Sequence, residues 1–112
     1  MKRGEIWWAE LPDPVGSEPG YARPVVIISA DRFNATAIDT VTVVYLYANL
    51  AVGRHPGNVT LLSRDTGLDR DSVANVTQLG TIDKQHVQRR IGAVPPTRLR
   101  DFDDGLRLAL QL

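Results

Sequence analysis

The segment Thr40–Tyr47 limits the folds open to this chain more than any other part of it. Its residues, TVTVVYLY, are β-branched, aromatic or leucine without exception, and β-branched and aromatic residues are enriched in strands. Successive side chains of a strand point to opposite faces. One face then carries Val41, Val43, Tyr45 and Tyr47, and the other carries Thr42, Val44 and Leu46. The segment predicts a strand and a fold built largely from β-structure.

Several other short segments have the same character and are separated by glycine, proline and polar residues. We expect strands in them, because β-formers bounded by turn residues are typical of strands. They are Glu5–Leu11, Val25–Ile28, Asn58–Leu62, Ser72–Ile82 with a bend at Gly80, and Arg90–Val94. Val25–Ile28 is apolar throughout, which predicts a strand buried on both faces.

The end of the chain has a helical pattern instead. Leu99, Phe102, Leu106 and Leu110 recur at intervals of three and four residues, so they share one face of a helix. Thr97, after two prolines, is a candidate N-cap. Gly105 in the middle of this helix costs about 1 kcal/mol in helix propensity.

Two short turns complete the predicted elements. Ala30–Ala37 is expected to form a helical turn capped by Asp31 or Asn34, and Asp83–Val87 is expected to form a short capped turn. Many short strands with a terminal helix predict an α+β, mainly β fold: a small, strongly bent β-barrel or partly open sheet.

Composition predicts one globular domain over residues 1–112. The apolar fraction is 43% and the charged fraction 23%, which are ordinary values for a globular protein. No apolar run approaches the roughly 18 residues that span a bilayer, and no signal-type segment follows Met1. We therefore expect a cytoplasmic protein that does not associate with membranes. The absence of cysteine excludes disulfides and thiolate chemistry.

The overall charge does not indicate a nucleic-acid binder, because the formal net charge is zero. Its distribution is uneven. Five basic residues and one histidine stand between positions 84 and 100 without an acid: Lys84, His86, Arg89, Arg90, Arg98 and Arg100. Such a run fits either a solvated surface, the more common case, or a patch that follows phosphates.

The sequence predicts no metal site and no cofactor. His55 and His86 are the only histidines, and neither has a second histidine at a metal-binding spacing. Asp13, Glu18 and Asp31 carry oxygen ligands suited to Mg²⁺, but loop carboxylates are usually only solvated. Walker-type and GxSxG motifs are absent from the sequence.

Arg23 is the most suggestive polar residue. It directly follows the glycine- and proline-rich stretch from Pro12 to Ala22 and precedes Pro24 and the apolar run. Its planar, permanently charged guanidinium suits a phosphate, and binding residues concentrate on loops held by rigid elements. An equally good structural alternative is that Arg23 binds loop carbonyls or pairs with Glu18.

Three ordered motifs carry a resemblance to a known family. "RGEIWWAELPDPVGSEPGYARPVVIIS", "DSVANVTQLGTIDK" and "RIGAVPPTRLRDFDDGLRLALQL" resemble the opening, the DSV…TIDK segment and the C-terminal region of MazF/PemK toxin endoribonucleases. The combination is specific, although no single motif is, and the likeness covers nearly the whole chain.

This resemblance implies a compact SH3-like barrel that works as a homodimer. It also implies metal-independent cleavage of single-stranded RNA, with 2′,3′-cyclic phosphate and 5′-hydroxyl products, and inhibition by a cognate antitoxin whose tail covers the RNA groove. The site residues implied are Arg23 of the RP pair as a catalytic residue, Glu18 of GSE as its support and Gln78 on the RNA-binding surface.

The chain departs from the family at Tyr47. Members usually end the third strand in a triplet like Pro-Ile-Thr, and the threonine hydroxyl works with the arginine; aligned through His55–Val59, that threonine falls on Tyr47. Three outcomes are open. Tyr47 acts in catalysis, or Thr42, Ser72 or Asn49 serves instead, or activity is weak. Tyr47 as an ordinary aromatic at the rim of the barrel is at least as good an interpretation.

Residues near this site are candidates for RNA binding. Tyr21 and Trp8 offer rings on which bases stack. Trp7 and Trp8 must point to opposite faces of their strand, so one belongs to the core and the other to a surface or interface. Further candidates are Arg54, Lys84 and Asn49, with His55 as a minor one.

Two other function classes fit the sequence. An inactive relative would bind RNA or the antitoxin as a dimer without cleavage, and Tyr47 at the threonine position is the best argument for it. A small protein-interaction barrel is the other class, and the zero net charge favours it.

Overall fold

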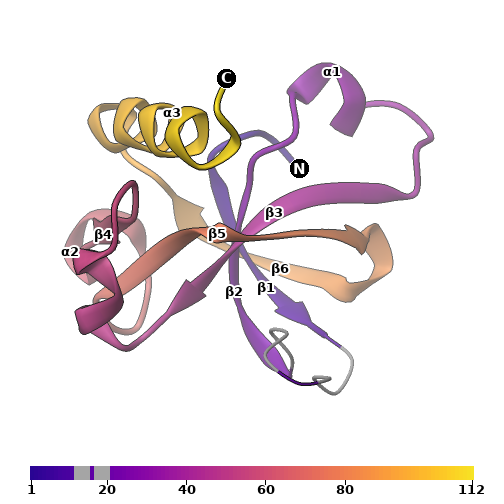
Figure 1. The fold of residues 1–112 in the computed structure, drawn as a ribbon. Helices are drawn as coiled ribbons and strands as arrows, with labels where there is room; N and C mark the ends of the chain where they lie inside the picture. The colour runs from indigo at the N-terminus through magenta and orange to yellow at the C-terminus, as the bar shows by residue number, and fades with distance from the viewer. Residues whose placement is uncertain (12–15, 17–20) are drawn as a thin grey trace.

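The computed structural model describes residues 1–11, 16 and 21–112. Six strands form one antiparallel sheet in the order β4-β5-β3-β2-β1-β6. Their bounds are β1 Glu5–Glu10, β2 Ala22–Ile27, β3 Thr40–Tyr47, β4 Val59–Leu61, β5 Ser72–Asp83 and β6 Val87–Ala93. The sheet curls into a half-open barrel whose edges are β4 and β6 (Figure 1). The predicted mainly β fold with a bent sheet is confirmed.

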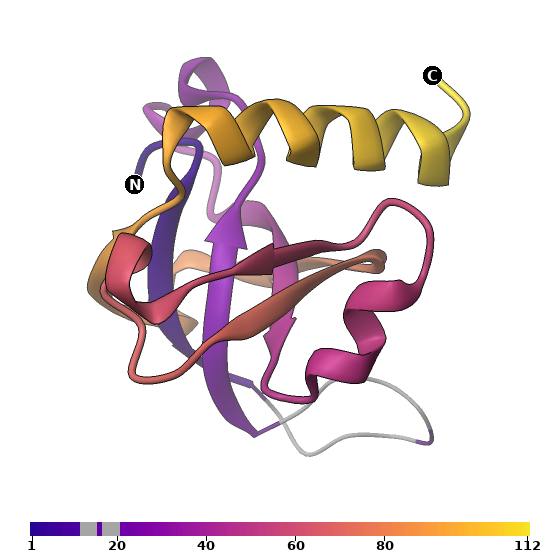
Figure 2. The same ribbon diagram turned by 90° about the vertical axis from the view of Figure 1, so that its left-hand side faces the viewer.

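Helical segments lie between and after the strands. They are α1 Asp31–Asn34, the 3₁₀ turns η1 Leu50–Arg54 and η2 Lys84–His86, α2 Ser63–Thr66 and α3 Pro96–Leu110. α3 crosses one end of the sheet and contacts β4 and β5 (Figure 2). α2 contacts β6, at the opposite edge from β4. Within the part of the chain that the structure describes, no helix is both long and apolar enough to span a membrane.

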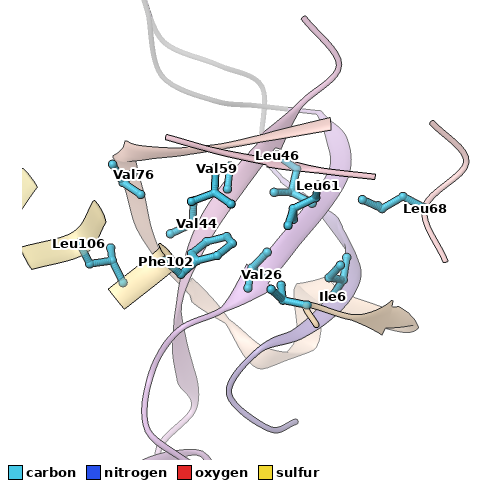
Figure 3. Packing of buried hydrophobic residues seen from close by; sticks show 12 residues of the cluster. Ile6, Val26, Val44, Leu46, Val59, Leu61, Leu68, Val76, Phe102 and Leu106 are labelled. Carbon is cyan, nitrogen blue, oxygen red and sulfur yellow. The ribbon is translucent and has the colours of Figure 1, made fainter. Parts of the chain in front are cut away.

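The central strands are buried on both faces of the sheet. Figure 3 shows a first apolar cluster in which Phe102 of α3 lies among side chains of the sheet. Its buried members are Ile6, Val26, Val44, Leu46, Val59, Leu61, Leu68, Ala74, Val76, Val94, Phe102 and Leu106. The second cluster occupies the other face and contains Ala9, Val25, Ile27, Val41, Val43, Tyr45, Ile82 and Val87. Residues of β2 and β3 alternate between the two clusters, as predicted for both segments.

α3 departs from the prediction at both ends. Phe102 and Leu106 are buried and Leu99 is partly buried against the first cluster, but Leu110 is 49% exposed because the helix runs past the sheet. Thr97 is not the N-cap. The helix begins at Pro96, the cap position is Pro95, and no side chain caps the end. Proline at the first helical position needs no N–H partner.

The two predicted short turns have different outcomes. Asp83 caps η2, its carboxylate accepting a hydrogen bond of 2.9 Å from the main-chain N of Gln85. Neither Asp31 nor Asn34 caps α1, since Ala30 is at the cap position and no side chain bonds there. Asp31 instead accepts a hydrogen bond of 2.6 Å from the main-chain N of Arg3, and the buried Asn34 amide donates to Ser29 O at 2.8 Å.

One close contact joins β3 to Gly80 of β5. Tyr45 is buried, and its ring lies over Gly80 so closely that a Cβ at residue 80 would lie 1.9 Å from the Tyr45 hydroxyl oxygen. Gly80 pairs with Val43, so Tyr45 reaches it diagonally, as long side chains do across neighbouring strands. Only glycine at position 80 leaves room for this tyrosine.

Candidate functional site

A cleft of about 480 Å³ lies beside the strands that carry Arg23 and Tyr47. Trp8 of β1, Arg23 and Pro24 of β2 and Leu46 of β3 contribute to its lining. The lining is completed by Tyr47 and Ala48, by residues 67–70 and Ser72 after α2, and by residues 89–91 of β6. The cleft therefore draws on segments that are far apart in the sequence.

Arg23 and Tyr47 meet in this cleft. The guanidinium carbon of Arg23 lies 4.7 Å from the centre of the Tyr47 ring, within the range of an attractive cation–π contact. The register explains the meeting. Val25 pairs with Tyr45, and continuing this antiparallel register brings Arg23 level with Tyr47. Arg23 lies inside β2 rather than at its junction with the loop, because strand pairing with β1 already begins at Ala22.

Burial and charge act on the Tyr47 phenol in opposite directions. Burial raises the pKa of Tyr47 because it disfavours the phenolate, and the nearby Arg23 charge lowers it by a smaller amount. The net pKa lies above the usual value of 10.0. At neutral pH, Tyr47 is therefore a hydrogen-bond donor and not a base.

A second arginine–aromatic pair lies in the same cleft. The guanidinium carbon of Arg89 on β6 is 5.3 Å from the centre of the Trp8 ring. Trp8 pairs with Pro24 on one side and with Arg89 on the other, so this pair and the Arg23–Tyr47 pair are held by adjacent strands. Trp7 packs against the second apolar cluster, as expected for the neighbour of a cleft residue.

Arg90 also lines the cleft but contacts a carboxylate. Its Nε donates to Glu5 Oε2 at 2.9 Å, and the Trp7 indole N–H and the main-chain N of Lys2 donate to Glu5 Oε1. Burial raises the pKa of the Glu5 carboxyl, but these hydrogen bonds and the Arg90 charge together lower it below its usual 4.5. Glu5 stays ionised and holds Arg90 across β1 and β6.

The described lining of the cleft is strongly positive. It contains four arginines, Arg23, Arg70, Arg89 and Arg90, and one carboxylate, Asp69. Ser72 is buried at the wall, and its hydroxyl donates to Arg70 O at 3.1 Å. A chain of zero net charge thus concentrates positive charge at one hollow, an arrangement suited to an anionic ligand.

The structure places the predicted catalytic residues as follows. Arg23 and Tyr47 lie together in the cleft, and Glu18 lies outside the described residues. Of the alternatives to Tyr47, Ser72 is part of the cleft lining, whereas Thr42 and Asn49 are not among its lining residues.

The predicted RNA-binding residues lie elsewhere. The cleft lining does not include Gln78, Asn49, Arg54, Tyr21 or Lys84. Asn49 caps η1 by accepting from the main-chain N of Ala51 at 3.1 Å, and Lys84 Nζ donates to Asn34 O and Thr36 O, both at 3.1 Å. These two side chains have structural partners. Tyr21 is 63% exposed just before β2, and Gln78 and Arg54 lie on β5 and at the end of η1.

Sequence reasoning did not single out Arg70, Asp69, Arg89 or Arg90 as site residues. The available signals were the basic run after position 84, which contains both β6 arginines, and the predicted stacking role of Trp8. Within the described ranges, no three histidine, aspartate or glutamate side chains gather into a metal-binding group.

Comparison with known proteins identifies the family of the chain. The family model of the PemK-like, MazF-like toxin of type II toxin–antitoxin systems matches residues 2–110. The chain belongs to this family. The resemblance stated from the three sequence motifs is confirmed.

Relatives of this MazF-like chain are named endoribonucleases. Endoribonuclease MazF6 of Mycobacterium tuberculosis (strain ATCC 25618 / H37Rv) is 42% identical over 112 residues, covering 100% of this chain and 98% of that protein. The solved structure of Mycobacterium tuberculosis toxin MazF-mt6 has a TM-score of 0.79 at 22% identity, covering 96% of this chain and 97% of its own. A mycobacterial endoribonuclease in complex with its cognate antitoxin has a TM-score of 0.79 at 23% identity, covering 100% and 96%. These structures confirm the expected barrel fold.

Proposed function

We propose that the chain is an endoribonuclease toxin that cleaves single-stranded RNA without a metal ion. The 2′-oxygen attacks the adjacent phosphorus, and the products carry 2′,3′-cyclic phosphate and 5′-hydroxyl ends. The observation that carries the proposal is the Arg23 guanidinium held on the Tyr47 ring inside a cleft lined by further arginines. Family membership and the names of the relatives support it.

Arg23 stabilises the charge that develops on the phosphorane. Attack by the 2′-oxygen adds negative charge to the non-bridging oxygens, and a fixed guanidinium needs no rearrangement to meet that charge. Donors of this kind contribute about 3–4 kcal/mol each to transition-state stabilisation. The Tyr47 ring fixes the plane of the guanidinium before RNA binds.

Tyr47 donates a proton or a hydrogen bond. Since its pKa is raised by burial, the phenol keeps its proton at neutral pH and is suited to a non-bridging oxygen or to the leaving 5′-oxygen. Its longer side chain takes the place of the family threonine. The proton of the 2′-hydroxyl needs a separate acceptor, and Glu18 remains the proposed base on chemical grounds.

The partners follow from the same proposal. A cognate antitoxin inhibits the chain by covering the cleft with an acidic and apolar tail; that a solved neighbour is an endoribonuclease in complex with its cognate antitoxin supports a partner of this kind. We also propose a homodimer of MazF-like domains, each spanning residues 1–112, in the cytoplasm, where RNA and antitoxin are present. Gln78, Arg54 and Tyr21 remain proposed RNA contacts outside the cleft.

The second candidate is an inactive relative that binds RNA or the antitoxin as a dimer. Tyr47 at the threonine position favours it, because a phenol places its oxygen several ångströms farther from the backbone.

One assay separates the two candidates. The purified chain is incubated with a mixed single-stranded RNA in excess EDTA, and the ends of the products are analysed. We expect cleavage with cyclic-phosphate ends, and a loss of about 100-fold or more in Arg23→Ala. Binding without cleavage would select the inactive relative. Cleavage that stops in EDTA would reject metal independence. If the chain neither binds nor cleaves RNA at low salt, the result would favour the small protein-interaction barrel.

A further inference from the structure

We propose that Val73 holds the Tyr47 ring against the Arg23 guanidinium and is a positioning residue for cleavage. The inference rests on the proposed function. It also gives a role to the DSV motif, Asp71-Ser72-Val73, which carries part of the family resemblance but has no part in the proposed mechanism.

Arg23, Tyr47 and Val73 stand in a row across one face of the sheet. Tyr47 pairs with Val73 of β5, and the pairing of Val25 with Tyr45 brings Arg23 level with Tyr47 on the other side. Val25 and Tyr45 belong to the second apolar cluster. Residues two apart on a strand share a face, and so do residues directly opposite each other on paired strands. The row therefore has the guanidinium on one side of the Tyr47 side chain and Val73 on the other.

Val73 is enclosed on the side away from Tyr47. It is completely buried, although among the residues that the structure describes it belongs to neither apolar cluster. It pairs with Thr60 of β4, and η1 lies directly over both residues. A Cβ at Gly53 of η1 would lie 2.9 Å from Thr60 Oγ1 and 3.5 Å from Val73 Cγ2. With η1 this close, Val73 has no room to move away from Tyr47.

The two polar residues of the motif fix the start of β5. Asp71 Oδ1 accepts a hydrogen bond of 2.8 Å from the main-chain N of Ser63. The buried Ser72 donates from Oγ to Arg70 O at 3.1 Å. Both bonds hold the chain just before Val73. The motif thus places a branched apolar side chain at a fixed position opposite Tyr47.

A fixed ring matters because the guanidinium rests on it. The guanidinium carbon of Arg23 lies 4.7 Å from the centre of the Tyr47 ring. Tyr47 is only partly buried against the second cluster, so the core does not enclose the ring completely. An empty space in place of Val73 would let the ring turn into it and leave the guanidinium. A displacement of about 1 Å in a catalytic group costs up to roughly 100-fold in rate.

The first test does not require cleavage. Protons that lie over an aromatic ring resonate upfield of their usual position, so NMR of the Arg23 side-chain protons reports their contact with Tyr47. Tyr47→Ala gives the reference value without the ring. We expect Val73→Ala to lose most of this ring-current shift. A full shift in Val73→Ala would overturn the proposal.

Val76→Ala is the matched control. It makes the same truncation at another buried valine of β5, but Val76 belongs to the first apolar cluster, on the other face of the sheet. We expect it to keep the ring-current shift of wild type. A loss equal to that in Val73→Ala would mean that any cavity in β5 loosens the ring, which would reject a specific role for Val73.

A second substitution separates position from stability. Val73→Thr keeps the branched shape but buries a hydroxyl, which destabilises the fold, and Val73→Ala destabilises it by leaving a cavity. We expect thermal melts to show a lower melting temperature for both variants, while only Val73→Ala loses the ring-current shift. Loss of the shift in both would assign the effect to stability and contradict the proposal.

The kinetic test asks whether Val73 acts through Tyr47. We expect Val73→Ala to lower kcat roughly tenfold with little change in KM, because the pair is placed for charge that develops only in the transition state. Adding Val73→Ala to Tyr47→Ala should lower kcat no further, since no ring is left to hold. An unchanged kcat in the single variant, or losses that add in free energy, would reject the positioning role.

The two tests separate this inference from the proposed function. If wild type does not cleave RNA and Val73→Ala still loses the ring-current shift, Val73 holds the ring and only the nuclease proposal fails. If wild type cleaves RNA and Val73→Ala keeps the shift, the nuclease proposal stands and this one fails.

Discussion

At neutral pH the Tyr47 phenol, which lies beside the Arg23 guanidinium, contributes a hydrogen-bond donor. Burial raises the pKa of Tyr47, and Arg23 offsets only part of this effect. A proton donor next to a permanent cation is a useful pair for a phosphate that gains charge, because both groups favour the more negative state. The same geometry makes Tyr47 unsuitable as a base.

We expect Tyr47→Phe to lower the cleavage rate at least tenfold, since the ring that holds Arg23 is kept and only the donor is lost. The measurement is single-turnover cleavage as a function of pH. Because the pKa of Tyr47 is raised above 10.0, wild type loses the donor only in the alkaline range above that value, and the variant lacks this alkaline decline. A variant rate equal to that of wild type removes Tyr47 from the mechanism.

At the scale of residues, the sequence motif and its alignment with the family identify Arg23 and Tyr47 as candidate site residues, and the structure brings the two side chains together. The Arg89–Trp8 pair was not predicted. The pairing of β1 with β6 shifts register twice, between Ile6 and Trp7 and between Trp8 and Ala9. Which residue of the basic run meets Trp8 depends on those shifts, and periodicity alone does not reveal them.

At the scale of elements, α3 illustrates a conflict between local propensity and packing. Glycine at position 105 costs about 1 kcal/mol in a helix relative to alanine. Gly105 is nevertheless buried, and a Cβ there would lie 2.1 Å from the main-chain oxygen of Gly57. The loop before β4 approaches the helix closely, and a main-chain atom does not move aside as a flexible side chain does.

We therefore expect Gly105→Ala to destabilise the protein by about 1–3 kcal/mol, because the overpacking outweighs the gain in propensity. Urea unfolding monitored by tryptophan fluorescence measures the change. Asp104→Ala is the matched control. It alters the adjacent helical residue, whose ion pair with Arg107 is solvent-exposed, and its effect should stay within about 0.5 kcal/mol. A stabilised Gly105→Ala variant would contradict the packing argument.

The strands were predictable to within a few residues because their composition and alternation are strong. β3 has the predicted bounds, and β5 runs through Gly80 as one strand, whose irregular pairing with β3 lies between Ala74 and Leu79 rather than at Gly80. β6 begins earlier than predicted, at Val87, because pairing with β1 extends it through polar residues. The burial of Leu99 and the exposure of Leu110 depend on where α3 leaves the sheet, which a stripe at helical spacing does not specify.

At the scale of the whole molecule, the Glu5–Arg90 ion pair joins the first and last strands along the chain, which are neighbours in the sheet. The folded-state pKa of Glu5 is lowered from 4.5. A carboxyl with a depressed folded pKa stabilises the fold above its unfolded pKa, and this contribution is lost as the pH falls through the folded value.

We expect Glu5→Gln to lower the free energy of unfolding by about 0.5–1 kcal/mol at neutral pH. The difference from wild type should shrink as the pH falls below 4.5. Urea unfolding at several pH values measures it. Asp101→Asn, which breaks an exposed helical pair with Arg98, is the control and should change little at any pH. A pH-independent Glu5→Gln effect would assign the loss to packing instead of charge.

The contact of Tyr45 with Gly80 has a consequence for how the chain finds its fold. β3 is apolar on both faces, so sliding it by one residue against β5 would exchange one set of buried side chains for the other at little hydrophobic cost. Hydrophobicity alone therefore does not distinguish the native alignment from its nearest competitor. The space above Gly80 does distinguish them, because a residue with a Cβ at that place would clash with the Tyr45 ring. Steric fit at this point selects the alignment of β3 with β5, which keeps β3 in place for the separate pairing with β2 that brings Arg23 level with Tyr47.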